Sequence, residues 1–268
     1  MNDISSDTKP LPAEGRTELT IKDGVATVLF NRPAARNAMT WAMYEQLASA
    51  CETIAADDSV RVACFRGVGG KAFVAGTDIA QFLDFESGDK GVAYEHAIGH
   101  FVGKMAGLTV PTVAIVEGWA VGGGMALANV CDFRIASNGT RFGVPIARTL
   151  GNCLSSASLA SLTATLGTAM VRRMVLLGEM VDAGELYSHG YLLKVVAPEE
   201  LDAVADAVVT TLLGHAPITM AVTKQLMARQ ANGDMEDEDL VRLTYGSDDF
   251  REGVKAFTEK RPPKWTGR

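Results

Sequence analysis

Apolar residues in the first half of the chain alternate between the spacing of strands and that of helices. Short apolar or alternating runs typical of strands recur between positions 18 and 136. They are Glu18–Lys22, Val25–Phe30, Val60–Phe65, Thr112–Val116 and Asp132–Ala136. Two segments with helical spacing lie between them, from Thr40 to about Asp57 and from about Val92 to Leu108. This alternation predicts βαβ units and a mostly parallel sheet, preceded by a hairpin at Asp23-Gly24.

The second half of the chain is mainly helical by the same criterion. After Ser155 the strand signal is confined to a short stretch, Leu192–Val196. The expected helices are Ala169–Leu177, Leu201–Leu213, Ile218–Gln230 and Leu240–Lys260, with breaks at Gly214, Pro217, Gly233 and Gly246. We therefore expect a disordered tail at residues 1–16, an α/β core at residues 17–198 and a helical C-terminal region at residues 199–268.

Composition and charge narrow the class of protein. The 268 residues are 47% hydrophobic and 21% charged, which is too apolar for a disordered chain. The net charge of −7 disfavours binding to a phosphate backbone, so no nucleic-acid partner is expected. No apolar run approaches the ~20 residues of a membrane-spanning helix, and the N-terminus lacks the pattern of a secretory signal. The sequence thus predicts a cytoplasmic protein with no membrane partner.

Four cysteines are spread along the chain without a C-x-x-C pair. Cys51, Cys64, Cys131 and Cys153 all lie in largely apolar surroundings. Disulfides and a zinc site are therefore disfavoured, and we expect buried thiols and no metal.

Two glycine-rich segments are candidates for binding chemistry. The first, Gly67–Ala72, imitates a dinucleotide fingerprint, but no helix opens after it, so its glycines are interpreted as turn residues. The second, Gly122-Gly123-Gly124, lies between an expected strand and an apolar helical run. Glycines at a helix start leave N–H groups approachable, which makes this segment a candidate oxyanion site or a tight corner. A second N–H donor from another segment would favour the oxyanion site.

An ordered set of motifs resembles one protein family. They are Asn31-Arg32-Pro33, Asn37-Ala38-Met39, Lys71–Ile79, Gly118–Gly124, Cys131-Asp132, Phe142-Gly143-x-Pro145 and Asp248–Arg261. In this order and spacing they resemble the crotonase, or enoyl-CoA hydratase/isomerase, superfamily. The resemblance implies a crotonase-like α/β fold, a spiral of ββα repeats followed by a helical C-terminal region.

The resemblance also implies a substrate and a site. Members bind acyl-CoA thioesters and stabilise an enolate-like thioester oxygen with two backbone N–H groups, which by position are those of Ala75 and Gly123 here. Coenzyme A is part of the substrate, and no other cofactor is expected. The implied CoA and substrate contacts are Ala35, Arg36, Ala38, Thr77, Asp78, Ile79, Gly122, Pro145, Phe257 and Lys260. The last two lie in the C-terminal region, through which the family forms homotrimers or dimers of trimers.

This sequence departs from the family at both catalytic carboxylates. The hydratases place glutamates at the positions occupied here by Ala126 and Ile146. Neither side chain can accept a proton, and general acid–base catalysis is typically worth roughly 10²–10⁴-fold. The proton-transfer group must therefore be sought elsewhere.

Several polar residues are alternatives for that role. His100 and Asn152 are the polar candidates, although His96 and His100 at helical i, i+4 spacing also fit a solvated helix face. Tyr94 and Glu95 are possible proton carriers beside them. Ser155 and Ser156 fit a helix N-cap better than a catalytic role.

Three functions remain open on the sequence alone. The first is an enzyme that handles acyl-CoA or enoyl-CoA through enolate stabilisation. The second is a CoA-thioester or β-diketone hydrolase or a decarboxylase of the same fold. The third is a non-catalytic acyl-CoA-binding subunit, which the loss of both glutamates favours.

Overall fold

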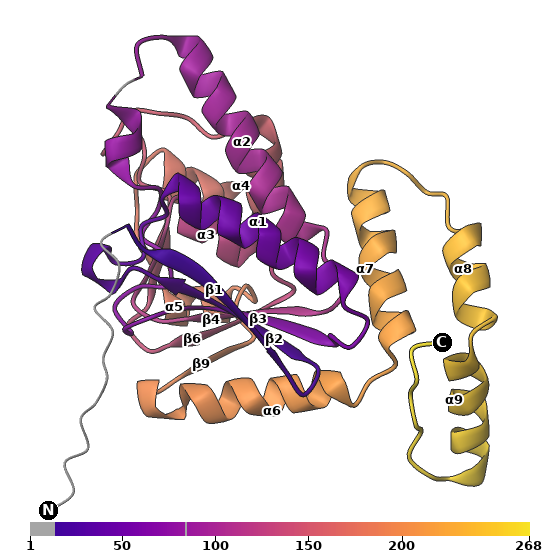
Figure 1. Cartoon of the computed structure of the whole chain (residues 1–268). Helices are drawn as coiled ribbons and strands as arrows, with labels where there is room; N and C mark the ends of the chain where they lie inside the picture. The colour runs from indigo at the N-terminus through magenta and orange to yellow at the C-terminus, as the bar shows by residue number, and fades with distance from the viewer. Residues whose placement is uncertain (1–13, 84) are drawn as a thin grey trace, which may run out of the picture.

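A six-stranded sheet forms the centre of the molecule. The computed structural model describes residues 14–83 and 85–268. The sheet order is β1 (Arg16–Lys22), β2 (Val25–Asn31), β3 (Val62–Gly67), β4 (Thr112–Val116), β6 (Phe133–Ser137) and β9 (Lys194–Val196) (Figure 1). Strands β1 and β2 pair antiparallel and every later pair is parallel. The predicted hairpin, strands and mostly parallel sheet are confirmed.

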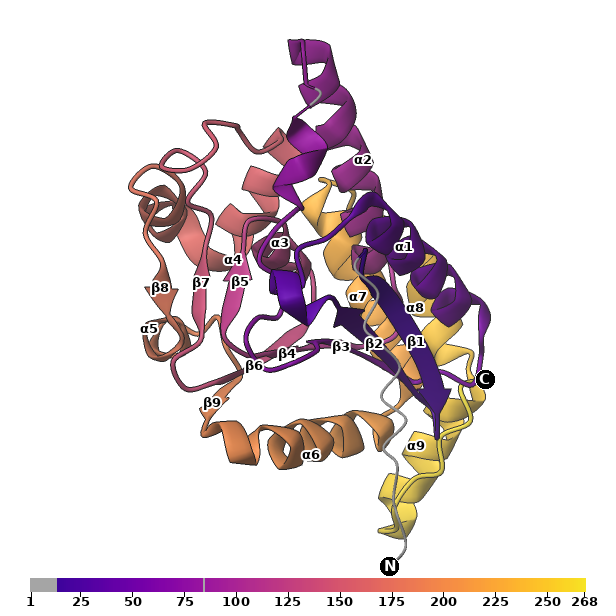
Figure 2. The same cartoon turned by 60° about the vertical axis from the view of Figure 1, so that its left-hand side comes forward.

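Helices cover both faces of this sheet because its central strands are apolar on both sides. In β3, Val62 and Cys64 pack with helix α6 (Leu201–Leu213), whereas Ala63 and Phe65 face the opposite core. That core contains buried residues of α1 (Trp41–Ala56) and α2 (Gly88–Ala106). Figures 1 and 2 show α6 beneath the sheet, with α1 and α2 above it. The continuous apolar strand pattern thus corresponds to a doubly covered sheet.

A second, three-stranded sheet was not predicted. It comprises β5 (Trp119–Val121), β7 (Arg141–Gly143) and β8 (Val181–Asp182), in that order. Strands of two or three residues are too short to show a period of two, so only tertiary pairing reveals them. The pairing of β5 with β7 supports the start of α3 (Gly123–Asn129), which begins within the triple glycine.

Helix boundaries differ from the expectations where glycines or caps intervene. Helix α4 (Ser156–Val175) begins well before the expected Ala169, and the non-helical φ of 70° at Gly167 kinks it. The Ser155 hydroxyl accepts a hydrogen bond from the Ser158 N–H at 3.2 Å, which confirms the predicted N-cap. The remaining helices are α5 (Ala183–Ser188), α7 (Pro217–Ala231), α8 (Glu238–Tyr245) and α9 (Asp248–Glu259), together with 3₁₀ turns at Pro33–Ala35, Ile79–Phe82 and Pro198–Glu200.

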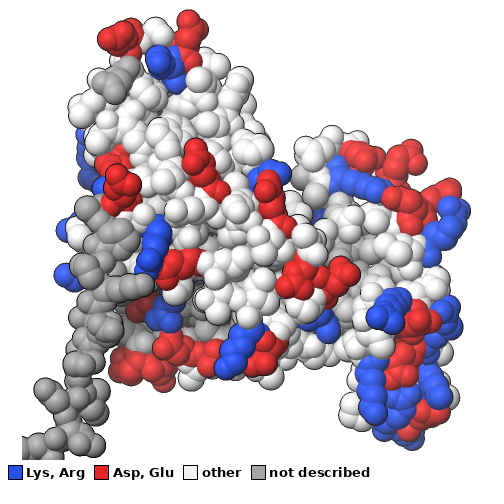
Figure 3. Space-filling model, viewed as in Figure 1, with Lys and Arg blue, Asp and Glu red and all other residues white. Residues whose placement is uncertain are grey.

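The last three helices extend to one side of the core (Figure 1). Lys224 of α7 ties them to it, since its Nζ lies 2.5 Å from Asp132 Oδ2 and donates to the Val110 carbonyl at 2.8 Å. Figure 3 shows lysines and arginines intermixed with acidic side chains over the far end of this extension. Arg251 and Arg261, for example, pair with Asp248 and Glu252.

The expected N-terminal tail falls on residues 1–13, outside the described residues, and on residues 14–16, where Arg16 already begins β1.

Cys51, Cys64 and Cys131 are buried as expected, but Cys153 is exposed, so that part of the cysteine prediction is wrong. Cys153 lies in the irregular segment before α4.

Among the described residues, no single helix has the length and apolar composition to cross a membrane. Two helical segments, Pro198–Leu213 and Pro217–Ala231, reach that length and composition only when they are taken together, and the chain bends by 99° between them.

Candidate active site

A cavity of about 440 Å³ lies where the loop before the 3₁₀ turn Ile79–Phe82 meets the corner between β5 and α3. Phe82, Ile98 and Leu154 give it an apolar wall. Polar groups enter from the loop at positions 75–78 and from Tyr94 and Glu95 of α2. An apolar cleft with a few convergent polar groups is typical of a small-molecule site.

Two backbone N–H groups approach each other in this cavity. A Cβ built on Gly123 would lie 3.8 Å from the Thr77 nitrogen, so the two peptide units are neighbours. On either side of Thr77, the Met39 N–H donates to the Gly76 carbonyl at 2.8 Å and the Asp78 N–H donates to the Met39 carbonyl at 2.9 Å. The Thr77 N–H between them therefore points away from Met39. Within the described part of the chain, neither the Thr77 nor the Gly123 N–H has a hydrogen-bond acceptor.

The expectation for Ala75 needs correction. Its N–H donates to the Arg36 carbonyl at 3.1 Å and is not available to a ligand. Gly76, with φ of 108°, separates it from Thr77 and reverses the direction of the following amide. In a regular strand the amides of residues 75 and 77 would point the same way, and sequence position alone could not reveal this reversal.

Each residue of the triple glycine meets a different constraint. Gly122 has φ of 54° and ψ of −114°, and its N–H donates to the Gly143 carbonyl at 3.0 Å. A Cβ on Gly123 would lie 2.7 Å from the Tyr44 hydroxyl, and a Cβ on Gly124 would lie 1.9 Å from the Val74 carbonyl oxygen. The segment is thus both a tight corner and an approachable helix start, the two interpretations that the sequence left open.

Tyrosine hydroxyls fix the side chain of Thr77. The Thr77 hydroxyl is hydrogen-bonded to Tyr94 at 2.7 Å and to Tyr44 at 3.0 Å. Burial raises the pKa of Tyr94 to about 12 and that of Tyr44 further still. Both phenols are therefore protonated at neutral pH, and they hold the loop that carries the Thr77 N–H.

The cavity also receives the Glu95 carboxyl group. Its Oε2 accepts a hydrogen bond from the Ser155 N–H at 2.9 Å, at the start of α4. Burial raises the pKa of Glu95, and the hydrogen bonds from Ser155 partly oppose that effect. A carboxyl group with a raised pKa is better matched to proton transfer near neutral pH than an exposed one.

The second carboxyl group at the cavity, that of Asp78, is engaged by the loop. Its Oδ2 lies 2.7 Å from Arg32 Nη1, and its Oδ1 accepts from the Ala80 N–H at 3.2 Å. Ala126 and Ile146 also line the cavity, and neither side chain brings a polar group to it.

Most residues expected at the site do line this one cavity. They are Ala35, Arg36, Ala38, Ala75, Thr77, Asp78, Ile79, Gly122, Gly123, Pro145 and Asn152. His100 does not, because it is exposed on α2 and lines a separate groove beside Cys51 of α1. Its candidacy as a proton-transfer group in this cavity is therefore wrong.

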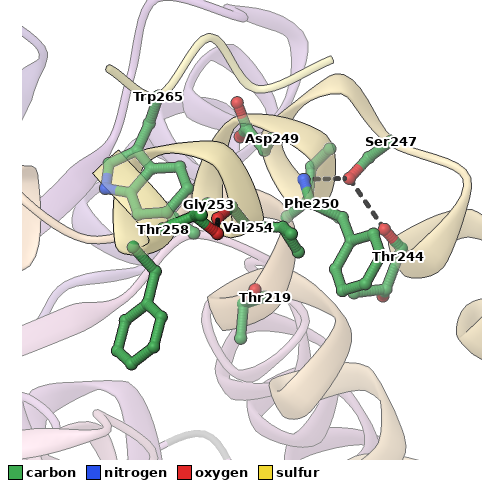
Figure 4. A pocket seen from close by; sticks show the side chains of 12 residues that line it. Thr219, Thr244, Ser247, Asp249, Phe250, Gly253, Val254, Thr258 and Trp265 are labelled. Carbon is green, nitrogen blue, oxygen red and sulfur yellow. Dashed lines mark hydrogen bonds between the residues drawn. The ribbon is translucent and has the colours of Figure 1, made fainter. Parts of the chain in front are cut away.

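Phe257 and Lys260 also lie away from the cavity in the single chain. Phe257 is 88% exposed and borders a second cavity, of about 420 Å³, between α7 and α9. Figure 4 shows that cavity, with Trp265 at one end and the Ser247 cap of α9 at the other. Among residues 14–83 and 85–268, no cluster of three or more His, Cys, Asp or Glu side chains could hold a metal ion.

Known proteins are similar to this chain over nearly its whole length. The family model described as enoyl-CoA hydratase/isomerase matches residues 20–268. A probable enoyl-CoA hydratase of Mycobacterium leprae is 31% identical over 249 residues, which cover 91% of this chain and 95% of that one. A trans-2-decenoyl-[acyl-carrier-protein] isomerase of Streptococcus mutans is 29% identical over 256 residues, 92% and 97% of the two chains.

A solved structure has a similar overall fold. The crystal structure of an enoyl-CoA hydratase/carnithine racemase from Magnetospirillum magneticum has a TM-score of 0.88 and 31% identity, covering 94% of this chain and 96% of that one.

Proposed function

Because this chain belongs to the enoyl-CoA hydratase/isomerase family, we propose that its cavity binds the thioester of an acyl-CoA or enoyl-CoA and stabilises negative charge on the thioester oxygen. The donors in this proposal are the N–H groups of Thr77 and Gly123. The fold is the crotonase fold that the sequence resemblance implied.

The observation that carries the proposal is the pair of N–H groups without acceptors in one cavity. Two such donors lower the free energy of an enolate or tetrahedral oxyanion more than that of the neutral thioester carbonyl. Each donor of this type is worth about 3–4 kcal/mol of activation free energy. The start of α3 at Gly123 adds positive potential at the same point.

The rim of the cavity suits an anionic carrier. Arg36 lines the cavity and is exposed, so its guanidinium is free to approach phosphate groups in solvent. Asp78 is paired with Arg32, which limits its repulsion of an anionic ligand. These features support binding of the CoA portion at the loop of residues 35–38.

Vibrational spectroscopy tests the oxyanion site directly. Butanoyl-CoA with a ¹³C-labelled thioester carbonyl is added to the protein, and the carbonyl stretch is followed by difference infrared spectroscopy. Two hydrogen bonds should shift the stretch of the bound ligand to lower frequency relative to free ligand. A bound thioester with an unshifted carbonyl would contradict the proposal, as would failure to bind at millimolar concentration.

Thioester hydrolysis or decarboxylation is the alternative reaction. Asn152 lines the same cavity and has a carboxamide side chain, whereas Ala126 and Ile146 bring no carboxylate to the cavity. An amide can orient water or a leaving carboxylate without exchanging a proton. Product analysis with crotonyl-CoA and malonyl-CoA separates the cases, since free CoA or acetyl-CoA would favour this alternative. A protein that binds these thioesters without turning them over would favour a non-catalytic binding subunit.

Self-association is proposed from the family resemblance. Phe257 is 88% exposed and Val254 is 53% exposed on α9, which supports a contact with another copy of the chain. In a homotrimer or dimer of trimers, Phe257 and Lys260 would reach the CoA bound by a neighbouring copy. Light scattering measures the oligomer, and Phe257→Ser should weaken both self-association and CoA affinity. A monomer with full CoA affinity would contradict this.

A further inference from the structure

The cavity contains one carboxyl group that is not engaged by a cation. Among its described lining residues, the acidic ones are Asp78 and Glu95. Asp78 is bound by Arg32 and by the Ala80 N–H, whereas no Lys, Arg or His ion pair to Glu95 is found in the described part of the chain. Glu95 is thus the group at this site that can both accept and release a proton.

Its surroundings hold the carboxyl group in place without neutralising it. Helix α2 supplies Glu95, and the Ser155 N–H fixes its Oε2 from the start of α4. The neighbouring phenols of Tyr94 and Tyr44 are neutral at physiological pH, because burial raises their pKa values. His96, the next residue on α2, is exposed and faces away from the cavity lining.

Resting on the function proposed above, we propose that Glu95 moves a proton between two carbons of a bound enoyl thioester and thereby shifts its double bond. The carboxylate removes a proton from the carbon next to the double bond. The C–H electron pair then delocalises onto the thioester oxygen, which the Thr77 and Gly123 N–H groups stabilise. Glu95, now a carboxylic acid, returns the proton to another carbon, and the carboxylate is regenerated.

This reaction matches what the cavity offers. A double-bond shift needs one group that alternates between acid and base, and it consumes no water. Addition of water also needs a group that holds the attacking water, and Ala126 and Ile146 present only carbon at the positions of the family's paired glutamates. Burial also raises the pKa of Glu95, which favours a carboxyl group that alternates between acid and base.

The variant Glu95→Gln separates proton transfer from structure. The glutamine side-chain oxygen can still accept the hydrogen bond from the Ser155 N–H, but the amide cannot exchange a proton with carbon. The matched control is Asp89→Asn, which removes an exposed carboxylate from the first turn of the same helix.

The assay uses trans-3-hexenoyl-CoA in D₂O. Proton NMR follows both migration of the double bond and entry of deuterium into the chain. We expect the wild type and Asp89→Asn to move the double bond, with deuterium entering only to the extent that the Glu95 carboxylic acid exchanges with solvent before it returns the proton. Glu95→Gln should lose at least ~100-fold in kcat, with little change in KM. The wild-type kcat should rise with pH as Glu95 loses its proton, and this dependence should vanish in the variant.

The outcomes distinguish the proton-transfer role of Glu95 from the proposed oxyanion site. If the bound thioester carbonyl shifts in the infrared but Glu95→Gln moves the double bond as fast as the wild type, Glu95 is not the proton carrier. A double bond that does not move in the presence of the wild type, or a 3-hydroxyacyl-CoA as the product, would also overturn the double-bond shift. An unshifted carbonyl in the wild type instead refutes the proposed oxyanion site.

Discussion

The Thr77 hydroxyl lies 2.7 Å from the Tyr94 phenol oxygen, so the loop that carries one cavity N–H is tied directly to helix α2. Tyr44 of α1 approaches the same hydroxyl at 3.0 Å. Two helices far apart in sequence from the triple glycine therefore set the position of the Thr77 amide. Glu95 follows Tyr94 in the chain, so one turn of α2 both holds the loop with the Thr77 N–H and carries the Glu95 carboxyl group.

Thr77→Val tests this arrangement. The substitution keeps the shape of the side chain but removes its hydroxyl, which leaves the fully buried Tyr44 phenol without that partner. A buried hydroxyl left without a partner costs about 1–3 kcal/mol, so urea denaturation should show a loss of that size. The control Thr53→Val removes an exposed α1 hydroxyl that bonds only the Ser49 carbonyl. Equal stability of the two variants would contradict the predicted role.

Gly123→Ala should be rescued by a second substitution. The added Cβ would lie 2.7 Å from the Tyr44 hydroxyl, so either that ring or the helix start must move. Tyr44→Phe removes the obstructing oxygen, and the double variant should be more stable than the sum of the single effects predicts. Thermal unfolding of the four proteins gives the coupling, and strict additivity would argue against the contact.

Gly124→Ala should destabilise the protein more than Gly123→Ala does. Its Cβ would lie 1.9 Å from the Val74 carbonyl oxygen, a backbone atom that cannot rotate away. Overpacking of this kind typically costs about 1–3 kcal/mol or more. Expression yield and melting temperature should both fall below those of Gly123→Ala. A melting temperature equal to that of the wild type would show that the corner can open.

The stability of the protein should depend on pH through Glu95. Burial raises the folded-state pKa of Glu95 above its unfolded value. Its contribution to stability is therefore fully present below the unfolded pKa and is lost as the pH rises through the folded pKa. As the pH rises above about 4, the unfolding free energy of the wild type should decline relative to that of Glu95→Gln. Parallel profiles would mean that the carboxyl group titrates as it does in the unfolded chain.

Lys224→Met should loosen the C-terminal helices from the core. Lys224 Nζ contacts both Asp132 Oδ2 and the Val110 carbonyl, whereas methionine keeps the apolar stem without the charge. Loss of hydrogen bonds to a charged group is worth about 1.5–3 kcal/mol. Limited proteolysis should cut faster between α6 and α7 than in the wild type. Lys255→Met, on the exposed face of α9, provides the control and should leave that rate unchanged.

The sequence alone predicted a large part of the fold. The apolar runs at β3 and β4 identified doubly covered strands, because apolar side chains on both faces require a layer on each side. Ser155 was recognised as a cap for the same local reason, since its hydroxyl satisfies an N–H only three residues away. The short strands β5, β7 and β8 escaped prediction because nothing in two or three residues distinguishes a strand from a loop.

The candidate site depended more on long-range geometry. Glu95 and His100 lie on one helix, but five residues rotate a helix by about 140°, and only packing against α1 and α4 decides which face meets the cavity. Glu95 lines the site and His100 does not. By sequence, His100 was put forward with Asn152 as the polar candidate, and Glu95 was named only as a proton carrier beside it.

The sequence by itself determined the order of the elements, the family motifs and the absence of glutamate at positions 126 and 146, because these are properties of residue type and spacing. Tertiary structure decided which of two neighbouring amides lacks an acceptor within the described part of the chain. Ala75 and Thr77 belong to one motif, yet the Arg36 carbonyl takes the N–H of Ala75, while beyond Gly76, with its φ of 108°, the N–H of Thr77 points away from Met39 and has no acceptor in the described part of the chain. An N–H direction depends on backbone torsions and on distant acceptors, neither of which a motif specifies.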